Sequence, residues 1–223
     1  MCERFVRDAS WPEIWSAWHL SGPMPSAELG ADYNVAQGRE VAVVRSEQSE
    51  MAGGAMRWGL VPSFAMGTPP RRKSATARME TLDSQPLHRG PWKRAQRCLI
   101  PANGYYQWCA LPEIRGRQPF YVHCTDQDVF AFAGLWTGST KPNGEVVHSC
   151  AIITMTAEAE LLELGHRMPA ILAADDHAAW LQGSSDAARA TLRPYPDRNV
   201  KWWPVTKDVS NPCNNAPQLA EPL

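Results

Sequence analysis

Cys2 is the residue of this sequence whose type and position allow the most unusual chemistry. If Met1 is removed, Cys2 carries a free α-amine with a pKa of roughly 8 beside its own thiol with a pKa of roughly 8.5. Both groups are nucleophiles near neutral pH. An amine condenses with an aldehyde to an imine, and the neighbouring thiol then closes a thiazolidine ring. The alternative is an ordinary second residue without a chemical role, and the rest of the sequence has to decide between the two.

His166 is a second candidate for chemistry. It lies in a predicted turn between a helix and a strand, in the stretch His166-Arg167-Met168-Pro169. Such a turn places side chains at the rim of a sheet, where a histidine can transfer protons near pH 7. The other interpretation is a histidine with a purely structural role. The sequence has no phosphate-binding glycine pattern, no Gly-x-Ser-x-Gly and no His-Glu-x-x-His, which excludes those enzyme classes.

Basic residues gather in one stretch of an otherwise acidic chain. The net charge is −1, but the stretch from Arg71 to Arg97 holds eight basic residues against Glu80 and Asp83. Its local charge is therefore +6, which leaves −7 on the remainder. A basic strip on an acidic body is typical of a protein that binds phosphates along one groove. A solvated basic loop would have the same composition.

Length and composition predict a globular protein with one domain over residues 1–223. Hydrophobic residues make up 44% and charged residues 20% of the 223 residues, which are globular values. Six cysteines without a Cys-x-x-Cys pair argue against structural zinc, so we expect reduced thiols, no metal ion and no cofactor. The sequence has no apolar run long enough to span a membrane and no leader pattern, so we expect a cytoplasmic monomer, associated with the nucleoid if bacterial.

The elements that must position these residues are mainly short strands. A helix is predicted from Ser10, where Glu13 completes a capping box, to about Leu20. Gly53-Gly54 is predicted to be a turn that joins a strand at Glu40 to Arg45 with one at Ala55 to Trp58. Phe120 to Cys124 and Val129 to Leu135 are expected to pair with each other. Further predictions are strands at Arg97 to Ile100, Tyr105 to Trp108, Val146 to Thr156 and Val200 to Val205, a turn at Pro101 to Gly104, helices at Ala157 to Leu164 and Asp175 to Gln182, and a loop from Ser210 onwards.

Several stretches together resemble one known family. They are Met1-Cys2-x-Arg4-Phe5, Tyr33-Asn34-Val35-Ala36, Trp58-Gly59-Leu60-Val61-Pro62, Ala77-Arg78-x-Glu80-Thr81, Arg97 to Tyr106, Phe132-Ala133-Gly134-Leu135-Trp136 and His166-Arg167-Met168-Pro169. Their content and order resemble the SRAP family, the SOS-response-associated peptidase domain. The resemblance covers nearly the whole chain, from Cys2 to Pro222.

The resemblance implies an α+β fold, with a curved, barrel-like, mainly antiparallel β core and a few flanking helices. It also implies binding to single-stranded DNA at abasic sites, and a covalent thiazolidine link between Cys2 and the aldehyde of the opened sugar. Carried over by position, Cys2 is the nucleophile and His166 transfers protons. The expected DNA-binding residues are Asn34, near the N-terminal pocket, Arg78 on the DNA backbone, and Arg4, Phe64, Arg71, Arg72 and Arg89.

Three positions depart from the pattern of the family around the expected site. Gln107 replaces a glutamate that is thought to move protons, Thr76 replaces an asparagine, and Glu3 replaces a glycine. Loss of a general acid or base typically slows a reaction by about 10²–10⁴. Glu3 places an anion beside Cys2, where it would either repel phosphate or supply the missing carboxylate. Four hypotheses therefore stay open: a slow abasic-site crosslinker with lyase-like activity, a relative that binds damaged DNA without crosslinking, an N-terminal-cysteine peptidase or amidohydrolase, and a purely structural or partner-binding protein.

Overall fold

The strand β10 (Val146–Thr156) is the centre around which the other strands are arranged in the computed structural model. The model describes residues 3–26, 28–47, 50–70, 74–112 and 115–223. Five strands form a closed ring, because β9 pairs both with β6 and with β10. In ring order they are β10, β4 (Glu50–Trp58), β3 (Glu40–Glu47), β6 (Arg97–Ala102) and β9 (Phe130–Thr140).

The ring is mainly antiparallel, but β4 and β10 run parallel where Arg57 and Trp58 pair with Ser149 and Cys150. Short strands extend the ring at its edges. The strands β5 (Thr76–Arg78) and β11 (Arg167–Pro169) pair with β10, and β12 (Ile171–Leu172) pairs with β9. The strand β5 carries the predicted site residues Thr76 and Arg78, and His166 directly precedes β11.

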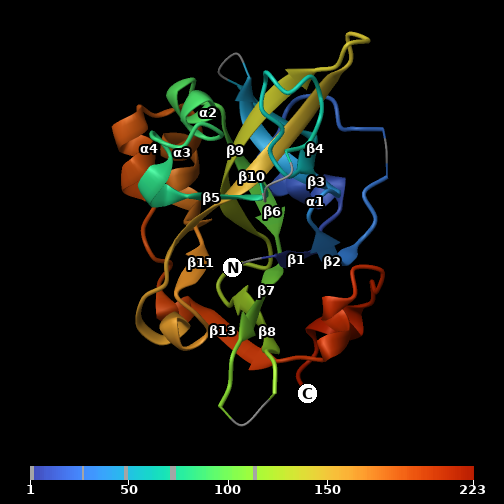
Figure 1. Ribbon diagram of the computed structural model, residues 1–223, viewed down its shortest axis with the longest axis vertical. Coiled ribbons are helices and arrows are strands. Elements are labelled where there is room, and N and C mark those ends of the chain that lie inside the picture. The colour runs from blue at the N-terminus through green and yellow to red at the C-terminus, as the bar shows by residue number, and fades with distance from the viewer. Residues whose placement is uncertain (1–2, 27, 48–49, 71–73, 113–114) are drawn as a thin grey trace.

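A second, wholly antiparallel sheet continues from the ring. Its order is β13 (Val200–Pro204), β8 (Gln118–Cys124), β7 (Gly104–Cys109), β1 (Arg4–Arg7) and β2 (Asp32–Ala36). Figure 1 shows the ring in the upper part of the view and β7, β8 and β13 in the lower part. Asn103 alone connects β6 of the ring with β7 of the second sheet.

Aromatic side chains join the two sheets in one core. The ring of Phe5 on β1 packs edge-on against Trp58 of β4 at 5.1 Å and against Phe132 of β9 at 5.7 Å, measured between ring centroids. Edge-to-face pairs at these distances stabilise a core beyond the apolar area that they bury. The first strand is therefore anchored in the ring, although its backbone partners lie in the second sheet.

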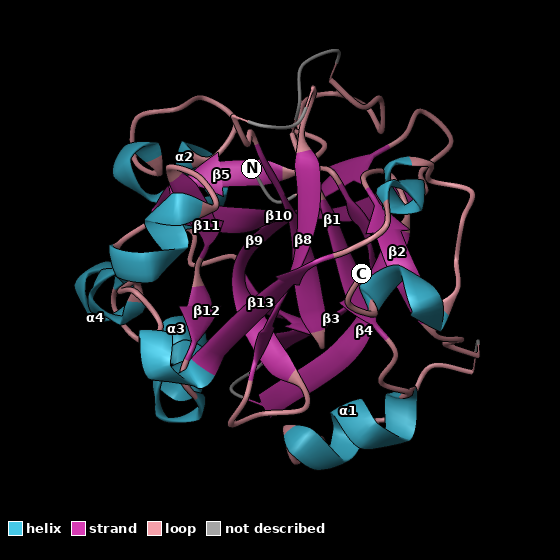
Figure 2. Ribbon diagram, turned by 90° about the horizontal axis from the view of Figure 1, so that it is seen from below, coloured by secondary structure: helices cyan, strands magenta, loops and turns pink. Residues whose placement is uncertain are grey.

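Short helices cover the flanks of the strands. Figure 2 shows α3 (His177–Gln182) and α4 (Ser185–Thr191) on one side of the strands and α1 (Trp11–Ala17) on another. The remaining helical segments are α2 (Arg89–Lys93) and six 3₁₀ turns, of which η1 (Met79–Thr81), η2 (Ala159–Glu163) and η5 (Lys207–Ser210) bear on the site. No helix in the described part of the chain is long and apolar enough to cross a membrane. The predicted α+β fold with a barrel-like antiparallel core is confirmed.

Most predicted elements are present, and the first helix begins as predicted. The backbone N–H and hydroxyl of Ser10 donate to Glu13 Oε2 at 2.7 Å and 2.6 Å, which is the reciprocal part of a capping box. The predicted strand Val146 to Thr156 has the same bounds as β10.

Two predictions about the strands were wrong. Gly53 and Gly54 lie inside β4 rather than in a turn, paired with Val44 and Val43. Phe120 to Cys124 and Val129 to Leu135 belong to different sheets and do not pair, because β8 pairs with β7 and β13 while β9 pairs within the ring.

Two further corrections concern the predicted turn and helix near the site. Pro101 and Ala102 belong to β6 and Gly104 begins β7, so Asn103 alone forms the connection. Ala157 to Leu164 holds a 3₁₀ turn, Ala159–Glu163, instead of a full helix. The tail after Ser210 also contains a 3₁₀ turn, Pro217–Ala220, where only loop was expected.

Candidate functional site

The strand β1 pairs with β7, the strand that carries Gln107. Antiparallel pairing places Arg4 opposite Tyr106 and Phe5 opposite Tyr105 of β7. Gln107 is the next residue of β7, and Glu3 is the first residue that the structure describes. Cys2, the predicted nucleophile, lies outside the described residues, directly before Glu3 in the sequence.

Arg4 and Asn34 hold β1 against the C-terminal part of the chain. Arg4 Nη1 donates to Asn34 Oδ1 at 3.0 Å, and Arg4 Nη2 donates to the carbonyl of Ser210 at 3.3 Å. Asn34 Nδ2 donates to the carbonyls of Asn211 at 2.9 Å and Asn214 at 3.0 Å. Burial lowers the pKa of Arg4. The buried Asn34 amide donates its protons in these bonds, so Asn34 supports the structure around β1 rather than forming an exposed contact surface.

A cavity of about 400 Å³ lies where the end of β7 meets η2 and the turn before β11. Two of the predicted catalytic residues, Gln107 and His166, line it together. Cys109, Arg117 and Glu163 also line it. The Cys109 thiol donates to the carbonyl of Glu163 at 3.2 Å, which ties β7 to η2. The structure thus brings Gln107 and His166, which are far apart in the sequence, into one open pocket.

Gln107 is the buried polar residue of this pocket. Its side chain is 5% exposed, and its Nε2 donates to the carbonyl of Leu164 at 3.5 Å. Its Oε1 is buried and has no hydrogen-bond partner among the residues that the structure describes. A buried acceptor without a partner costs free energy, about 1–3 kcal/mol in typical cases, and in a pocket it is a ready acceptor for a ligand N–H or O–H.

Gly165, in the turn before β11, lies close against Gln107. A Cβ atom at Gly165 would lie 2.8 Å from Gln107 Nε2, and the φ of Gly165 is +148°, a conformation that favours glycine. His166 is exposed at the rim of the pocket, and its backbone carbonyl accepts from Ala157 N at 3.1 Å. The predicted turn at His166 is therefore present, and His166 lines the same pocket as Gln107.

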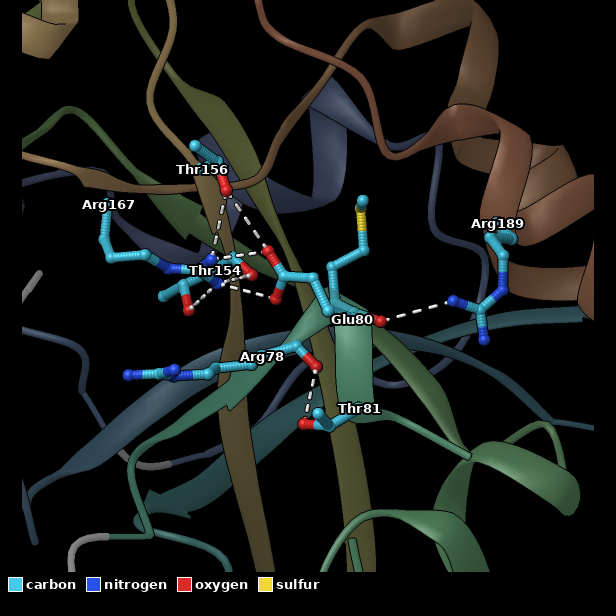
Figure 3. A network of polar contacts seen from close by, with 8 residues as sticks. Arg78, Glu80, Thr81, Thr154, Thr156, Arg167 and Arg189 are labelled. Carbon is cyan, nitrogen blue, oxygen red and sulfur yellow. Dashed lines mark hydrogen bonds and ion pairs between the residues drawn. The ribbon is translucent and has the colours of Figure 1, made fainter. Parts of the chain in front are cut away.

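An ion-pair network fixes the strands on both sides of β10 (Figure 3). Arg167 Nη2 donates to Glu80 Oε2 at 3.1 Å and to the carbonyl of Thr154 at 2.6 Å. The hydrogen bond from Arg167 lowers the pKa of Glu80, so Glu80 stays ionised. The network joins β11, β10 and η1, and so it holds the His166 turn in place relative to Arg78, which pairs in register with Thr154.

Arg78 and Thr76 lie on β5, next to β10. Thr76 pairs with Ile152 and is half-buried, and Arg78 is exposed. Figure 3 shows the Arg78 guanidinium extended away from the Glu80–Arg167 pair. In the described structure Thr76 does not line the pocket that contains Gln107 and His166.

Phe64 and Arg89, both predicted to bind DNA, line a second depression of about 200 Å³. Phe64 is 77% exposed, and prolines and Leu87 complete the lining together with Arg94. An exposed ring beside two arginines can stack on a base while the arginines contact phosphates. Arg71 and Arg72 lie outside the described residues, so their predicted role is not placed.

The comparison with known protein families decides the identity of the chain. The family model described as SOS response associated peptidase (SRAP) matches residues 1–212. The chain belongs to the SRAP family. Its described strands and helices are therefore those of an SRAP protein, and the resemblance in the sequence motifs is confirmed.

Curated relatives of this SRAP chain share a name. It is 32% identical over 225 residues, with 99% of each chain covered, to the abasic site processing protein YoqW of Bacillus subtilis. It is 30% identical over 224 residues to the abasic site processing protein YoaM of the same organism, covering 99% of this chain and 98% of YoaM. It is 28% identical over 196 residues to the abasic site processing protein HMCES of Xenopus tropicalis, covering 78% of this chain and 58% of that protein.

Solved structures agree with the SRAP fold. A protein of Bacteroides thetaiotaomicron superposes with a TM-score of 0.83 at 21% identity, with both chains covered completely. A protein of Bordetella bronchiseptica superposes with a TM-score of 0.78 at 25% identity, covering 92% of this chain and 100% of that one.

Sequence reasoning missed two residues of the site. The sequence does not identify Gly165 as a residue of the pocket, because its role depends on its backbone conformation and on its closeness to Gln107 in the fold. Arg167 stood in the quoted His-Arg-Met-Pro stretch, and its pairing with Glu80 of the Ala-Arg-x-Glu-Thr stretch could have been proposed from the opposite charges of the two motifs.

Proposed function

We propose that this SRAP protein processes abasic sites in DNA, and that it does so by forming a covalent crosslink through Cys2. Relatives that match nearly its whole length are named abasic site processing proteins. An abasic site equilibrates between a closed sugar and an open aldehyde. Removal of Met1 would give Cys2 the amine and thiol that condense with such an aldehyde to a thiazolidine.

The observation that carries this proposal is the position of β1. Arg4 of β1 pairs with Tyr106 of β7, and Tyr106 directly precedes Gln107, which lines the pocket together with His166. A nucleophile at this place would have a buried amide and an exposed imidazole beside it. The bonds from Arg4 to Asn34 and to Ser210 keep β1 in this position.

Single-stranded DNA is the proposed substrate form. Arg78, exposed on β5, would contact the phosphate backbone, and Phe64 with Arg89 would bind a neighbouring nucleotide by stacking and charge. Arg71 and Arg72, in the basic stretch, are proposed to add further phosphate contacts. Base stacking on an aromatic side chain requires unpaired bases, which is why we favour single strands over duplex DNA.

The proposal predicts a slow reaction. Gln107 cannot donate or accept a proton as a carboxyl group does, and Thr76 has no amide. His166 is the rim residue that can transfer protons, and it is exposed to water. Since a positioned general acid or base contributes typically about 10²–10⁴ in rate, we expect crosslinking over minutes to hours rather than seconds.

Intact mass spectrometry of the purified protein tests the proposal. We expect a chain that starts at Cys2 and gains the mass of an abasic-site oligonucleotide, less one water. Cys2→Ala should abolish the adduct. Cys213→Ala is the matched control, because Cys213 is an exposed free cysteine far along the chain, and this variant should crosslink like the wild type.

Two results would replace the proposal by another function. Protein that starts at Cys2 and binds the oligonucleotide without a mass shift would be a damage-binding protein rather than a crosslinker. A peptidase with Cys2 as nucleophile would retain part of its hydrolysis in Cys2→Ser, whereas an oxygen nucleophile cannot form the thiazolidine.

A further inference from the structure

The depression beside Phe64 and Arg89 has one buried polar residue at its floor. Thr137 of β9 lines the depression although it is only 2% exposed, whereas Phe64 and Arg89 are exposed. The Thr137 hydroxyl makes no hydrogen bond to any residue that the structure describes. What occupies the depression rests on the proposed function, because that function brings a DNA strand to this surface.

Two buried serines next to Thr137 use their hydroxyl groups differently. Ser149 pairs with Thr137 across β10 and β9, and its hydroxyl accepts from Val61 N at 2.8 Å. The hydroxyl of Ser139 accepts from Gly67 N at 2.9 Å. These two bonds fasten both ends of the intervening loop onto the strands. The Thr137 hydroxyl takes no part in them, so it is available to a ligand.

The fastened loop and α2 supply the rest of the depression. Phe64 lies on the loop, and its ring is 77% exposed. The helix α2 packs against β9 and contributes Arg89 and the buried Pro91. Arg94 follows α2, and its Nε and Nη2 donate to Gln96 Oε1 at 3.1 Å and 2.9 Å, which holds the guanidinium in one orientation. The depression thus combines an aromatic face, a cationic rim and a hydroxyl at its floor.

A single unpaired base fits both the size and the chemistry of this depression. Drug-sized ligands occupy about 300–1,000 Å³, and the depression has a volume of about 200 Å³, so its occupant is smaller. Bases stack on aromatic side chains. A base edge carries hydrogen-bond donors and acceptors, and a threonine hydroxyl can pair with either. Arg89 and Arg94 suit the phosphates on either side of the nucleotide.

A larger cavity elsewhere on the protein lacks this chemistry. Its volume is about 490 Å³, and Asp8, Glu13 and Asp128 line it. Three carboxylates would repel the phosphates of a DNA strand. Among the described residues that line the depression beside Phe64, by contrast, there are two arginines and no carboxylate.

We propose that this depression is a base-binding pocket for one nucleotide of the single strand near the abasic site. The base lies against the Phe64 ring, and its edge hydrogen-bonds to the Thr137 hydroxyl. Arg89 and Arg94 bind the adjacent phosphates. Thr137 is therefore a specificity-determining residue, because the four bases present different donors and acceptors at their edges.

Fluorescence anisotropy with a series of single-stranded oligonucleotides tests this assignment. Each carries one tetrahydrofuran abasic analogue as the lesion, which has no aldehyde and cannot crosslink, and a second one in place of a single nearby nucleotide. We expect loss of the base at one position to weaken binding of the wild type by about 10-fold. In Thr137→Val the effect of the same loss should be smaller by about 3- to 10-fold, because the hydrogen bond to the base is already missing.

Two further variants separate the hydrogen bond from a structural effect. Thr137→Ser keeps the hydroxyl and should retain the dependence on that base. Thr140→Val is the matched control and should behave like the wild type, because Thr140 is exposed on the same strand and does not line the depression.

Two results would overturn the base-binding pocket and leave the proposed function standing. One is an equal effect of base loss in the wild type and in Thr137→Val. The other is a wild type whose affinity depends on no single nearby base. A wild type that binds none of these oligonucleotides and forms no adduct with an abasic site would instead refute the proposed function itself.

Discussion

The neighbouring glycines of β4 allow a sharp test of the fold. Gly53 and Gly54 pair with Val44 and Val43 of β3, so both lie within one strand. A Cβ at Gly53 would lie 2.5 Å from Cη2 and Cζ3 of Trp15 and 3.0 Å from Leu20 Cδ1. A Cβ at Gly54 would meet no atom within 4 Å. Gly53→Ala and Gly54→Ala therefore make the same chemical change in opposite environments.

Trp15 has little freedom to move aside. Its Nε1 donates to the carbonyl of Gly22 at 2.9 Å, and its ring packs at right angles to that of Trp11 at 5.6 Å. Adding a methyl group to such a packed site costs about 1–3 kcal/mol. Replacing glycine by alanine also stabilises by about 0.4–1 kcal/mol through the unfolded chain. This gain is common to both variants, so their stabilities should differ by about 1–3 kcal/mol, with Gly53→Ala the less stable.

Urea unfolding followed by far-UV circular dichroism measures this difference. We expect Gly54→Ala to be as stable as the wild type or slightly more stable. Thermal unfolding should agree, since each kcal/mol shifts the Tm of a chain of this size by about 2–4 °C. Equal stabilities would refute the packing of Trp15 over Gly53. A large loss in both variants would indicate a tight turn at the two glycines instead of a strand.

Two further predictions concern pH and DNA. Burial lowers the pKa of His88 from 6.5 to about 4 in the folded protein, so the unfolded state binds more protons between these values. The contribution of His88 to the free energy of unfolding is fully present above pH 6.5 and decreases as the pH falls toward 4, by at most about 3 kcal/mol. Urea unfolding at several pH values should therefore show a smaller loss of stability in His88→Leu than in the wild type. Equal losses would contradict the lowered pKa of His88. Phe64→Ala should weaken binding to single-stranded DNA by about 1–3 kcal/mol in fluorescence anisotropy, and an unchanged affinity would exclude stacking on Phe64.

The parts of the fold that depend on local sequence were predictable. The capping box of Ser10 and Glu13 and the apolar run of β10 involve residues close together in the chain, and both are present. The turn predicted at Gly53-Gly54 was wrong, because a glycine pair usually marks a turn but here lies within a strand. The reason for glycine at position 53 is the ring of Trp15, which a local pattern cannot reveal.

The arrangement of strands depended on distant contacts. Phe120 to Cys124 and Val129 to Leu135 are close in sequence, which favours a hairpin, yet closure of the ring takes the second segment away to β6 and β10. Within the site, motifs identified Gln107 and His166, and the structure places both at one pocket. The close approach of Gly165 to Gln107 depends on the backbone path and could not be predicted from the motifs.

The bonds of β1 have a consequence for the order of events during synthesis. Arg4 and its acceptor Val209 are 205 residues apart. At a translation rate of about 5–20 residues per second, roughly 10–40 s pass between the emergence of the two partners from the ribosome. Strand β1 lacks its C-terminal support for this whole interval, which gives processing enzymes time to act on the residues before it. An incomplete chain lacks the acceptors of Arg4 at Val209 and Ser210, so the full support of β1 forms only after most of the protein has been made.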